Sequence, residues 1–257
     1  MPDKPFVHLH THSHFSLLDC TATPEALVEA ARANGMKALA ITDHGNMFGA
    51  VEFYETALQA GIKPIIGYEA YVAPDSRLSR QAKGIGDASF HLTLLARNQT
   101  GYKNLVHLAS IAYTEGFYYR PRVDREVLAK HRDGLVCLSG CLAGELAHYL
   151  LIEDEIRATE TAAFYRDLFG EGHFFIEIQD HGLADQRRIL PGFVRIAKKL
   201  DIPLVATNDN HYILKEDWEA HDALLCINTG KLVSDENRLR FQSQDFYFKT
   251  DAQMRAL

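Results

Sequence analysis

The chain has 257 residues, of which 47% are hydrophobic and 24% charged, a globular balance with enough apolar material for a sizeable core. No apolar run approaches a membrane span, we expect no signal peptide, and a formal charge of −7 argues against strong non-specific binding of nucleic acid. The four cysteines form no C-x-x-C pair, so a reducing cytoplasm is the expected location.

The first segment, FVHLHTHSHFSLLD at residues 6–19, carries a histidine at every second position from His8 to His14. Alternate residues of an extended strand point to the same face, so these imidazoles would stand side by side. Four neutral imidazoles make a poor core, whereas two or three around a metal make a good site. A chance histidine-rich surface strand or a tag remnant is the alternative, but the alternation with apolar residues argues against a tag. The segment therefore predicts metal binding.

Helices and short apolar strands alternate along the rest of the chain. The first helix is expected at 24–34, with Thr23 as its N-cap and Gly35 at its C-terminal stop. Further strands are expected at about 37–42, 61–72, 90–97, 134–141, 173–182 and 202–211, and further helices at about 46–60, 98–113, 153–169 and 185–200. Residues 73–89 are expected to form a loop, and Pro191 predicts a kink in the last of these helices.

Short apolar runs separated by helices indicate a parallel sheet buried on both faces. About seven such units favour a closed or distorted TIM-like (β/α) barrel over an open doubly wound sheet. Neither a G-x-G-x-x-G turn nor a P-loop is present. We expect one domain over residues 1–257, with the barrel at about 5–214. The extension at about 215–257 is expected to form a helix, a hairpin-like segment RFQSQDFYFKT and a final helix capped by Thr250 or Asp251, which would continue in a longer natural chain.

Side chains of metal-ligand type recur at the ends of the expected strands, and in a barrel the C-terminal strand ends form the active rim. These residues are His10, His12, Asp43, His44, Glu69, Cys141, Asp209 and His211. Asp19 can return to the same rim through the turn SLLD. Because five separate strand ends contribute, the whole set is stronger evidence for a metal site than any one residue.

Several of these residues have a structural alternative. Asp43 can cap the next helix or orient the histidine beside it, and Cys141 alone is more often a small buried apolar residue. His91 lies at the start of its expected strand, so the barrel pattern alone does not select it. His181 lies at a strand end, where it is a candidate contact with substrate. The stretch YYRPR at 118–122 can stack bases or hold phosphate, although an exposed loop is the simpler interpretation.

Six motifs, namely HLHTHS, ITDHGNMFGAVEFY, GIKPIIGYEAYV, SGCLAGE, IEIQDHG and LVATNDNHY, resemble the PHP (polymerase and histidinol phosphatase) domain family. They are most similar to the version found at the N-terminus of bacterial replicative DNA polymerase III alpha subunits. The resemblance covers nearly the whole chain, including LLCINTGKLVSDENRLRF in the extension. It implies a distorted (β/α)7 barrel, the PHP fold, with up to three divalent metals in a cleft at the barrel mouth.

The resemblance places the metal ligands of the family on nine positions, all occupied by residues of ligand type. They are His10, His12, Asp19, His44, Glu69, His91, Cys141, Asp209 and His211. This set includes His91, which the strand pattern leaves out, and excludes His8 and His14. By analogy Glu69 bridges two metals. His10, His12 and Asp209 would hold one of them, His91 and Cys141 the other, and Asp19, His44 and His211 a third. Asp19, Glu69 and Asp209 are the implied catalytic carboxylates, and His181 remains a candidate substrate contact.

Five imidazoles, three carboxylates and one thiol suit Zn²⁺, Mn²⁺ or Fe²⁺ better than Mg²⁺ or Ca²⁺. Such ions lower the pKa of bound water, so metal-bound hydroxide can attack a phosphoester near neutral pH. In this family the implied reaction is 3′→5′ exonuclease cleavage at DNA 3′ ends, as proofreading within a DNA-directed DNA polymerase. The implied partners are the remainder of the polymerase alpha chain and replisome subunits such as the proofreading subunit and the sliding clamp, with no membrane.

Two alternatives stay open. A small-molecule phosphatase of the histidinol-phosphate type has the same kind of centre, but the polymerase-type extension argues against it. A structural metal-binding module would stabilise the polymerase and dock partner subunits, and it would also keep its ligands. The chain is acidic and has no polymerase palm, so weak or slow activity is expected of it alone.

Overall fold

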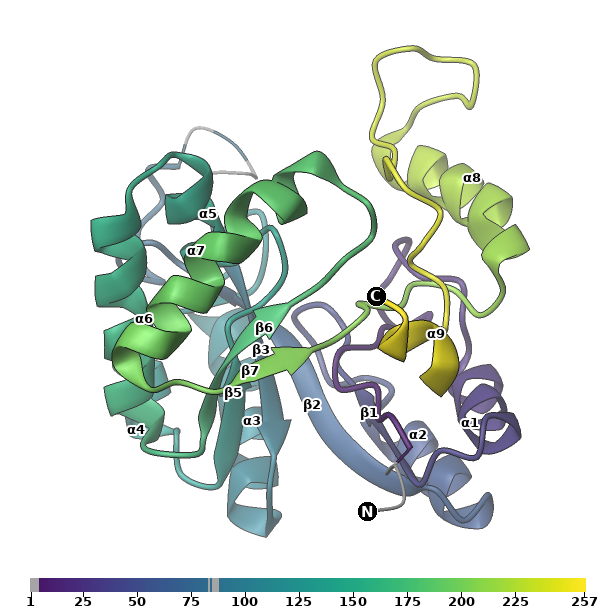
Figure 1. Ribbon diagram of the computed structural model, residues 1–257, viewed down its shortest axis with the longest axis horizontal. Helices are drawn as coiled ribbons and strands as arrows, with labels where there is room; N and C mark the ends of the chain where they lie inside the picture. Colours follow the sequence, from purple (N-terminus) through teal and green to yellow (C-terminus); the bar gives the residue numbers. More distant parts are fainter. Residues whose placement is uncertain (1–4, 83, 85–87) are drawn as a thin grey trace.

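The computed structural model describes residues 5–82, 84 and 88–257, and it contains a curled seven-stranded sheet flanked by helices (Figure 1). The strands are β1 (Ala38–Ile41), β2 (Lys63–Val72), β3 (Phe90–Ala96), β4 (Arg122–Val123), β5 (Leu135–Leu138), β6 (Phe174–Ile178) and β7 (Leu204–Ala206). They pair in the order β1-β2-β3-β5-β6-β7, and β4 pairs with β2. The strands expected from the apolar runs between residues 37 and 211 are therefore confirmed, although most are shorter than expected.

One strand runs against the others. β3 pairs antiparallel with both β2 and β5, whereas the remaining strand pairs are parallel. The expected all-parallel sheet is wrong at this point, because a loop rather than a crossover helix connects β2 to β3. The start of β3, where His91 stands opposite Tyr71, therefore lies at the rim formed by the ends of the parallel strands. Residues 83 and 85–87 of that loop, including Gly86, lie outside the described residues.

The histidine-rich segment does not form the expected regular strand. The amide of Thr11 donates to the Thr42 hydroxyl instead of to a backbone carbonyl, at 2.8 Å, which interrupts a strand ladder. The segment still links the two edges of the sheet, because the Thr42 amide donates to the Thr11 carbonyl and the His12 amide donates to the Asn210 carbonyl, at 2.8 and 2.9 Å. Thr42 follows β1 and Asn210 follows β7. The segment thus closes the curled sheet into a distorted barrel.

The helices surround this barrel on its outer side. They are α1 (Pro24–Ala33), α2 (Ala50–Gln59), α3 (Gln99–Thr114), α4 (Arg125–Lys130), α5 (Glu145–Leu151), α6 (Glu155–Phe169), α7 (Ala184–Leu200), α8 (Trp218–Thr229) and α9 (Asp251–Arg255). α1 begins at its predicted cap, since the Thr23 hydroxyl accepts from the Ala26 amide at 3.2 Å. α7 continues through Pro191 as one helix. The short elements β4, α4 and α5 were not expected from the sequence.

The C-terminal extension packs back onto the barrel. A 3-10 turn (Lys215–Asp217) leads into α8, and the final helix α9 is capped by the Thr250 side chain, as predicted. The expected hairpin at 240–250 is wrong. Its backbone bonds to the chain after β7 instead of to a strand of its own, since the His211 amide donates to the Phe246 carbonyl and the Phe248 amide to the Tyr212 carbonyl.

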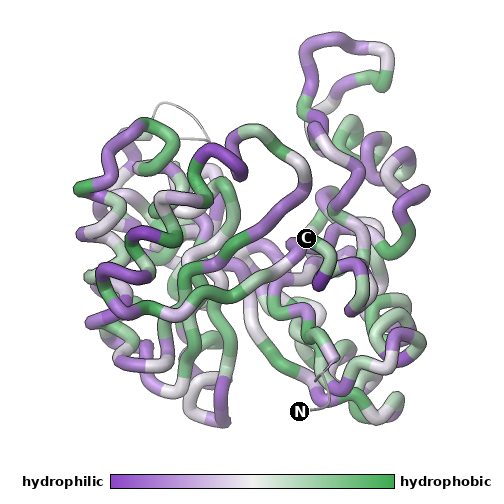
Figure 2. Tube along the Cα trace, viewed as in Figure 1, coloured by the Kyte–Doolittle hydropathy of each residue, from purple (hydrophilic) through white to green (hydrophobic). Residues whose placement is uncertain are grey.

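Hydrophobic residues are frequent along the strands, and hydrophobic and hydrophilic residues alternate along the helices (Figure 2). The larger core cluster lies among β2, β3, β5, β6 and α3 to α7, with Leu94, Leu105 and Phe174 among its fully buried members. A second cluster, around Leu27 and Phe53, packs α1 and α2 against β1. Among the described residues, none of the helices has the length and apolar character needed to cross a membrane.

Candidate metal centre

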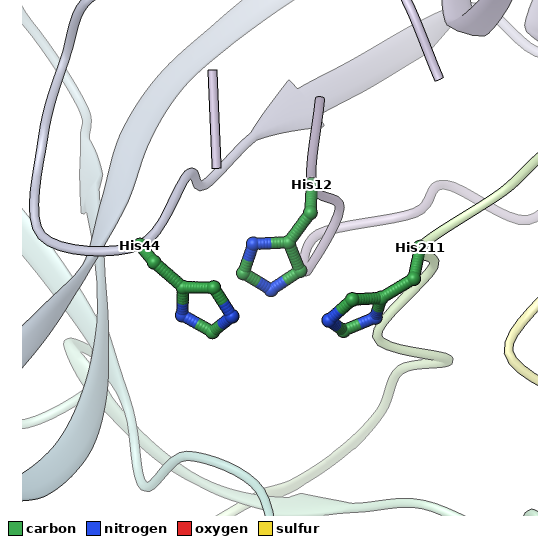
Figure 3. Close-up of side chains that lie close together, drawn as sticks. All are labelled: His12, His44 and His211. Atoms are coloured by element: carbon green, nitrogen blue, oxygen red, sulfur yellow. The ribbon is translucent and has the colours of Figure 1, made fainter. Parts of the chain in front are cut away.

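The nine predicted ligand residues meet at one end of the barrel, and histidine and glutamate side chains there form three groups of metal-ligand type. Within each group the ligand atoms lie within 4.8 Å of one another. The groups are His12, His44 and His211; His10, His12 and Glu69; and His44, Glu69 and His91. Figure 3 shows the rings of the first group directed toward a common space. The groups share members, so together they form one continuous cluster that could hold metal ions.

Glu69 lies at the middle of this cluster. Its side chain is fully buried and comes from the second half of β2. Oε1 lies 3.3 Å from His10 Nε2 and 2.9 Å from His91 Nδ1. Oε2 lies 3.5 Å from His12 Nε2 and 2.5 Å from His44 Nδ1. Each oxygen therefore faces one imidazole of the His10, His12 and Glu69 group and one of the His44, Glu69 and His91 group, so Glu69 could help to hold ions in both groups.

Asp209 approaches the same cluster from the chain after β7. Its Oδ1 lies 3.0 Å from His12 Nε2 and 3.3 Å from His10 Nε2. The backbone of Asp209 has φ of +48°, a left-handed conformation that is uncommon for residues other than glycine. His211, two residues later, uses Nδ1 to bond the Asp209 carbonyl at 2.8 Å, which leaves Nε2 directed to the cluster. Local strain in this turn thus accompanies the placement of two predicted ligands.

Asp19 and Cys141 complete the cluster at its edges. The turn SLLD returns Asp19 to the rim as predicted, with Leu18 at φ of +61°, and Asp19 Oδ2 lies 3.0 Å from His44 Nε2. Cys141 Sγ lies 3.8 Å from His91 Nδ1 and 3.7 Å from a Glu69 oxygen. All nine predicted positions are therefore within one connected set of contacts.

Five buried polar atoms in this set have no hydrogen-bond partner among the described residues. They are His10 Nε2, His12 Nε2, His44 Nδ1, Glu69 Oε2 and Asp209 Oδ1. Such atoms are rare in native proteins, and each costs about 1–3 kcal/mol when it stays unpaired. They lie close to one another without hydrogen-bond geometry. Ligands at about 2.0–2.1 Å from a tetrahedral metal are themselves roughly 3.3 Å apart, so the residues present fit divalent metal ions.

The electrostatics of the cluster favour the ligand forms of its carboxylates and of His12. Burial alone would raise the pKa of Glu69, but the charges of His91 and His44 outweigh it, and the pKa lies well below its ordinary value. Burial, with the charges of His44 and His211, lowers the pKa of His12 to about 3, so this imidazole is neutral at pH 7. Burial and the charge of Glu69 raise the pKa of the Cys141 thiol, so its thiolate needs a nearby cation.

Glu177 is a functional candidate that the sequence reasoning missed. This buried carboxylate lies on β6, and its Oε1 is 2.7 Å from His10 Nδ1. It also accepts hydrogen bonds from the Gly140 amide and from the hydroxyls of Thr93 and Thr207. A carboxylate on the second nitrogen of a ligating histidine fixes its tautomer and orientation. The available signal was a lone charged residue within the apolar strand FFIEI.

We expect Glu177→Gln to weaken metal binding by about 10- to 100-fold, because the amide no longer holds the His10 ring in its ligand form. Competition with a chromophoric chelator measures the affinity. Glu145→Gln is the matched control, since Glu145 is a buried carboxylate whose partners, Arg125 and Tyr165, lie outside the cluster. An affinity unchanged from the parent chain would contradict the orienting role of Glu177.

Asp43 is connected to the cluster through hydrogen bonds of Ser13 and Ser16. Its carboxylate accepts from the Ser13 amide at 2.6 Å and from the Ser16 hydroxyl at 2.7 Å. The Ser16 hydroxyl in turn lies 3.0 Å from His12 Nδ1 and accepts from the His44 amide at 3.1 Å. α2 has Gly49 at its N-cap, so Asp43 does not cap it. The capping alternative for Asp43 is therefore wrong, and through Ser16 its carboxylate is linked to the His12 ring and to the His44 backbone amide.

His181 is buried, and its ring is held by three neighbouring residues. Its Nε2 bonds the Asn208 carbonyl at 2.9 Å, its Nδ1 bonds the Gln186 side-chain nitrogen at 2.8 Å, and its ring stacks on Phe246 with centroids 3.9 Å apart. Burial lowers the pKa of His181. Both ring nitrogens of His181 bond to groups of the protein, so this residue has no free ring nitrogen for the predicted contact with substrate.

A cleft of about 310 Å³ opens beside the cluster. Its lining includes Asp19, His44, Tyr71, His91 and Arg120. The predicted ligands at this edge are partly accessible, with the Asp19 side chain 26% and the His91 side chain 20% exposed, whereas Glu69 is fully buried. The cleft therefore gives outside molecules access to one side of the cluster.

The comparisons with known sequences agree on one family. The model of the PHP domain family matches residues 8–181. The DNA polymerase III alpha subunit of Treponema pallidum is 52% identical over 257 residues, which cover 100% of this chain and 22% of that protein. The corresponding subunit of Thermus aquaticus is 50% identical, over 98% of this chain and 21% of that protein. The chain thus spans about a fifth of the length of these relatives.

Two solved structures are also similar. A predicted metal-dependent phosphoesterase from Bifidobacterium adolescentis aligns with a TM-score of 0.49 and 17% identity, over 82% of this chain and 89% of that chain. A two-domain protein from Bacteroides vulgatus, which contains a predicted PHP-like metal-dependent phosphoesterase, aligns with a TM-score of 0.45 and 15% identity. This alignment covers 90% of this chain and 57% of that chain.

Proposed function

The chain belongs to the PHP domain family, and we propose that it is the metal-dependent phosphodiesterase part of a bacterial replicative DNA polymerase III alpha subunit. Its proposed reaction is 3′→5′ exonuclease cleavage of DNA ends, as proofreading in the cytoplasm. The observation that carries this proposal is the group of five buried ligand atoms at and around Glu69 that have no hydrogen-bond partner in the described part of the chain. Such a group is costly without a cation and lies beside an open cleft.

We propose two or three divalent ions, with Zn²⁺, Mn²⁺ or Fe²⁺ preferred by the donor set. The holding residues would be His10, His12, Asp19, His44, Glu69, His91, Cys141, Asp209 and His211. When bound, such ions supply Lewis-acid activation of water and neutralise charge on phosphate oxygens.

The side chains of the protein prepare the centre for this chemistry. Glu69 and Asp209 are ionised and held rigidly by burial, so they need no rearrangement when the substrate arrives. Glu177 fixes the ring of His10. Asp19 and His91 are the more exposed members at the cleft, so the phosphodiester enters over this edge while the interior around Glu69 excludes water.

The experiment that tests this function is hydrolysis of a 3′-labelled single-stranded oligonucleotide, before and after chelation, beside a phosphomonoester as the competing substrate. We expect loss of the 3′ label that stops on chelation and returns with added metal. Preference for the phosphomonoester would instead support the small-molecule phosphatase. A DNA 3′ end that stays intact with Zn²⁺, Mn²⁺ and Fe²⁺ would overturn the exonuclease.

A structural role is the second candidate, and one observation favours it. The segment that carries His10 and His12 closes the barrel, because the His12 amide donates to the Asn210 carbonyl at the opposite edge of the sheet. Asp209 is the residue directly before Asn210. Metal ions held by these residues would join the two edges of the barrel and thereby stabilise the polymerase. The other proposed partners are the rest of the alpha chain and replisome subunits such as the proofreading subunit and the sliding clamp. The formal charge of −7 agrees with weak activity for this chain alone.

A further inference from the structure

Three exposed aromatic side chains form a row between the segment after His44 and the end of α3. Phe48 is 56%, Tyr113 41% and Phe117 52% exposed. The ring centroids of Phe48 and Tyr113 are 6.1 Å apart, and those of Tyr113 and Phe117 are also 6.1 Å apart. Phe48 follows the predicted ligand His44 by four residues, and Tyr113 lies at the end of α3. Contiguous exposed aromatics of this kind mark binding surfaces on soluble proteins.

Two arginines belong to the same region, since Arg120 lies in the loop after α3 and Arg80 donates to the Glu115 carbonyl at the start of that loop. Arg120 lines the cleft, and its guanidinium lies 5.5 Å from the ring of Tyr71. Arg80 lies 5.7 Å from the ring of Tyr118 and donates to backbone carbonyls. Within residues 5–82, 84 and 88–257, no carboxylate forms an ion pair with either arginine. Arg77, a close neighbour, is by contrast paired with three carboxylates.

The loop that carries Arg120 is built to hold it at the cleft. Tyr119 has φ of +61°, and Tyr118 and Arg120 form a bridge across it. Pro121 restricts the backbone of Arg120 to extended conformations. A Cβ on Gly45 would lie 2.8 Å from the Tyr71 ring and 3.0 Å from Pro121, so the loop packs directly on the residue after His44. The position of Arg120 relative to the centre is therefore fixed by packing.

This combination suits single-stranded nucleic acid. Unpaired bases offer their faces to exposed aromatic rings, whereas a duplex keeps those faces stacked inside, and guanidinium groups bind the phosphates between them. Local positive charge is needed because the chain as a whole carries −7. We propose that Phe48, Arg80, Tyr113, Phe117 and Arg120 form a surface that binds a single DNA strand and leads its end into the cleft. This inference rests on the proposed function in its choice of DNA as the ligand.

The test measures binding separately from cleavage. A fluorescein-labelled oligothymidylate with phosphorothioate linkages, which resist hydrolysis, is titrated with the metal-loaded 257-residue chain, and anisotropy reports the Kd. We expect Tyr113→Ala, which removes a ring that stacks on a base, and separately Arg120→Gln, which removes a charged phosphate contact, to raise the Kd by about tenfold each. Matched controls are Arg132→Gln in the loop before β5 and Tyr102→Ala at the opposite end of α3, both expected to leave the Kd within about twofold.

The inference is overturned if Arg120→Gln and Tyr113→Ala bind as tightly as the parent, or if a duplex of matched length binds as tightly as the single strand. The outcome also separates the two proposals. A Kd that rises in the Arg120 and Tyr113 variants, without 3′ cleavage of an ordinary oligonucleotide, would support the binding surface and contradict the exonuclease. Cleavage at the 3′ end, together with a Kd that does not change in the Arg120 and Tyr113 variants, would support the exonuclease and contradict the proposed binding surface.

Discussion

Replacing Glu69 by Gln is expected to remove at least one metal ion per chain and to lower phosphodiester hydrolysis by more than about 100-fold. The two oxygens of Glu69 face His10, His91, His12 and His44, so this one carboxylate serves both halves of the cluster. An amide is neutral, so it would hold divalent cations less tightly than the carboxylate would. Loss of an orienting partner alone costs about 10- to 100-fold in metal affinity or activity, and loss of a direct ligand costs more.

Elemental analysis and the oligonucleotide assay measure the two effects on the same sample. Glu145→Gln serves as control, because it also removes a buried negative charge, at a place where Arg125 and Tyr165 are the partners. We expect the control to keep its metal and its activity. A Glu69→Gln chain with the parental metal content and rate would show that the cluster is not the centre of the chemistry.

Removal of metal is expected to lower the thermal unfolding midpoint by about 10 °C. The cluster contains five buried atoms without partners in the described structure, and cations would satisfy them. A ligand at a thousand times its Kd stabilises the folded state by about 4 kcal/mol, and each kcal/mol shifts the midpoint of a domain of this size by about 2–4 °C.

Scanning calorimetry of the chelated chain, with and without added Zn²⁺ or Mn²⁺, checks this stabilisation. Glu69→Gln provides the comparison, since its midpoint should respond less to added metal than that of the parent. Equal midpoints for chelated and metal-supplemented parent chain would argue against tight binding at the cluster.

Sequence patterns located most of the barrel because most of its strands are largely buried and its helices carry local signals such as the Thr23 cap. They did not indicate the reversal of β3, since a strand buried on both faces has the same composition in either direction. The reversal is why barrel geometry passed over His91, which only the family resemblance recovered. The resemblance supplied the position of this residue, and the antiparallel pairing with β2 explains it.

Other features depend on contacts between distant segments, which no local pattern encodes. The histidine segment looks like a strand, but the Thr42 hydroxyl takes the place of a ladder partner. The sequence marks Glu177 only as a charged residue within an apolar strand, and its role depends on His10, which lies 167 residues away. The hairpin expected at 240–250 is wrong for the same reason, since the backbone of this segment bonds to the chain after β7.

The measurement that tests the central claim most directly is the metal content of the purified, untagged chain by elemental analysis. The cluster around Glu69 predicts two or three bound divalent ions per chain, with fewer in Glu69→Gln. Less than one ion per chain, after growth and purification with Zn²⁺, Mn²⁺ and Fe²⁺ supplied, would contradict the metal centre and the phosphodiesterase built on it.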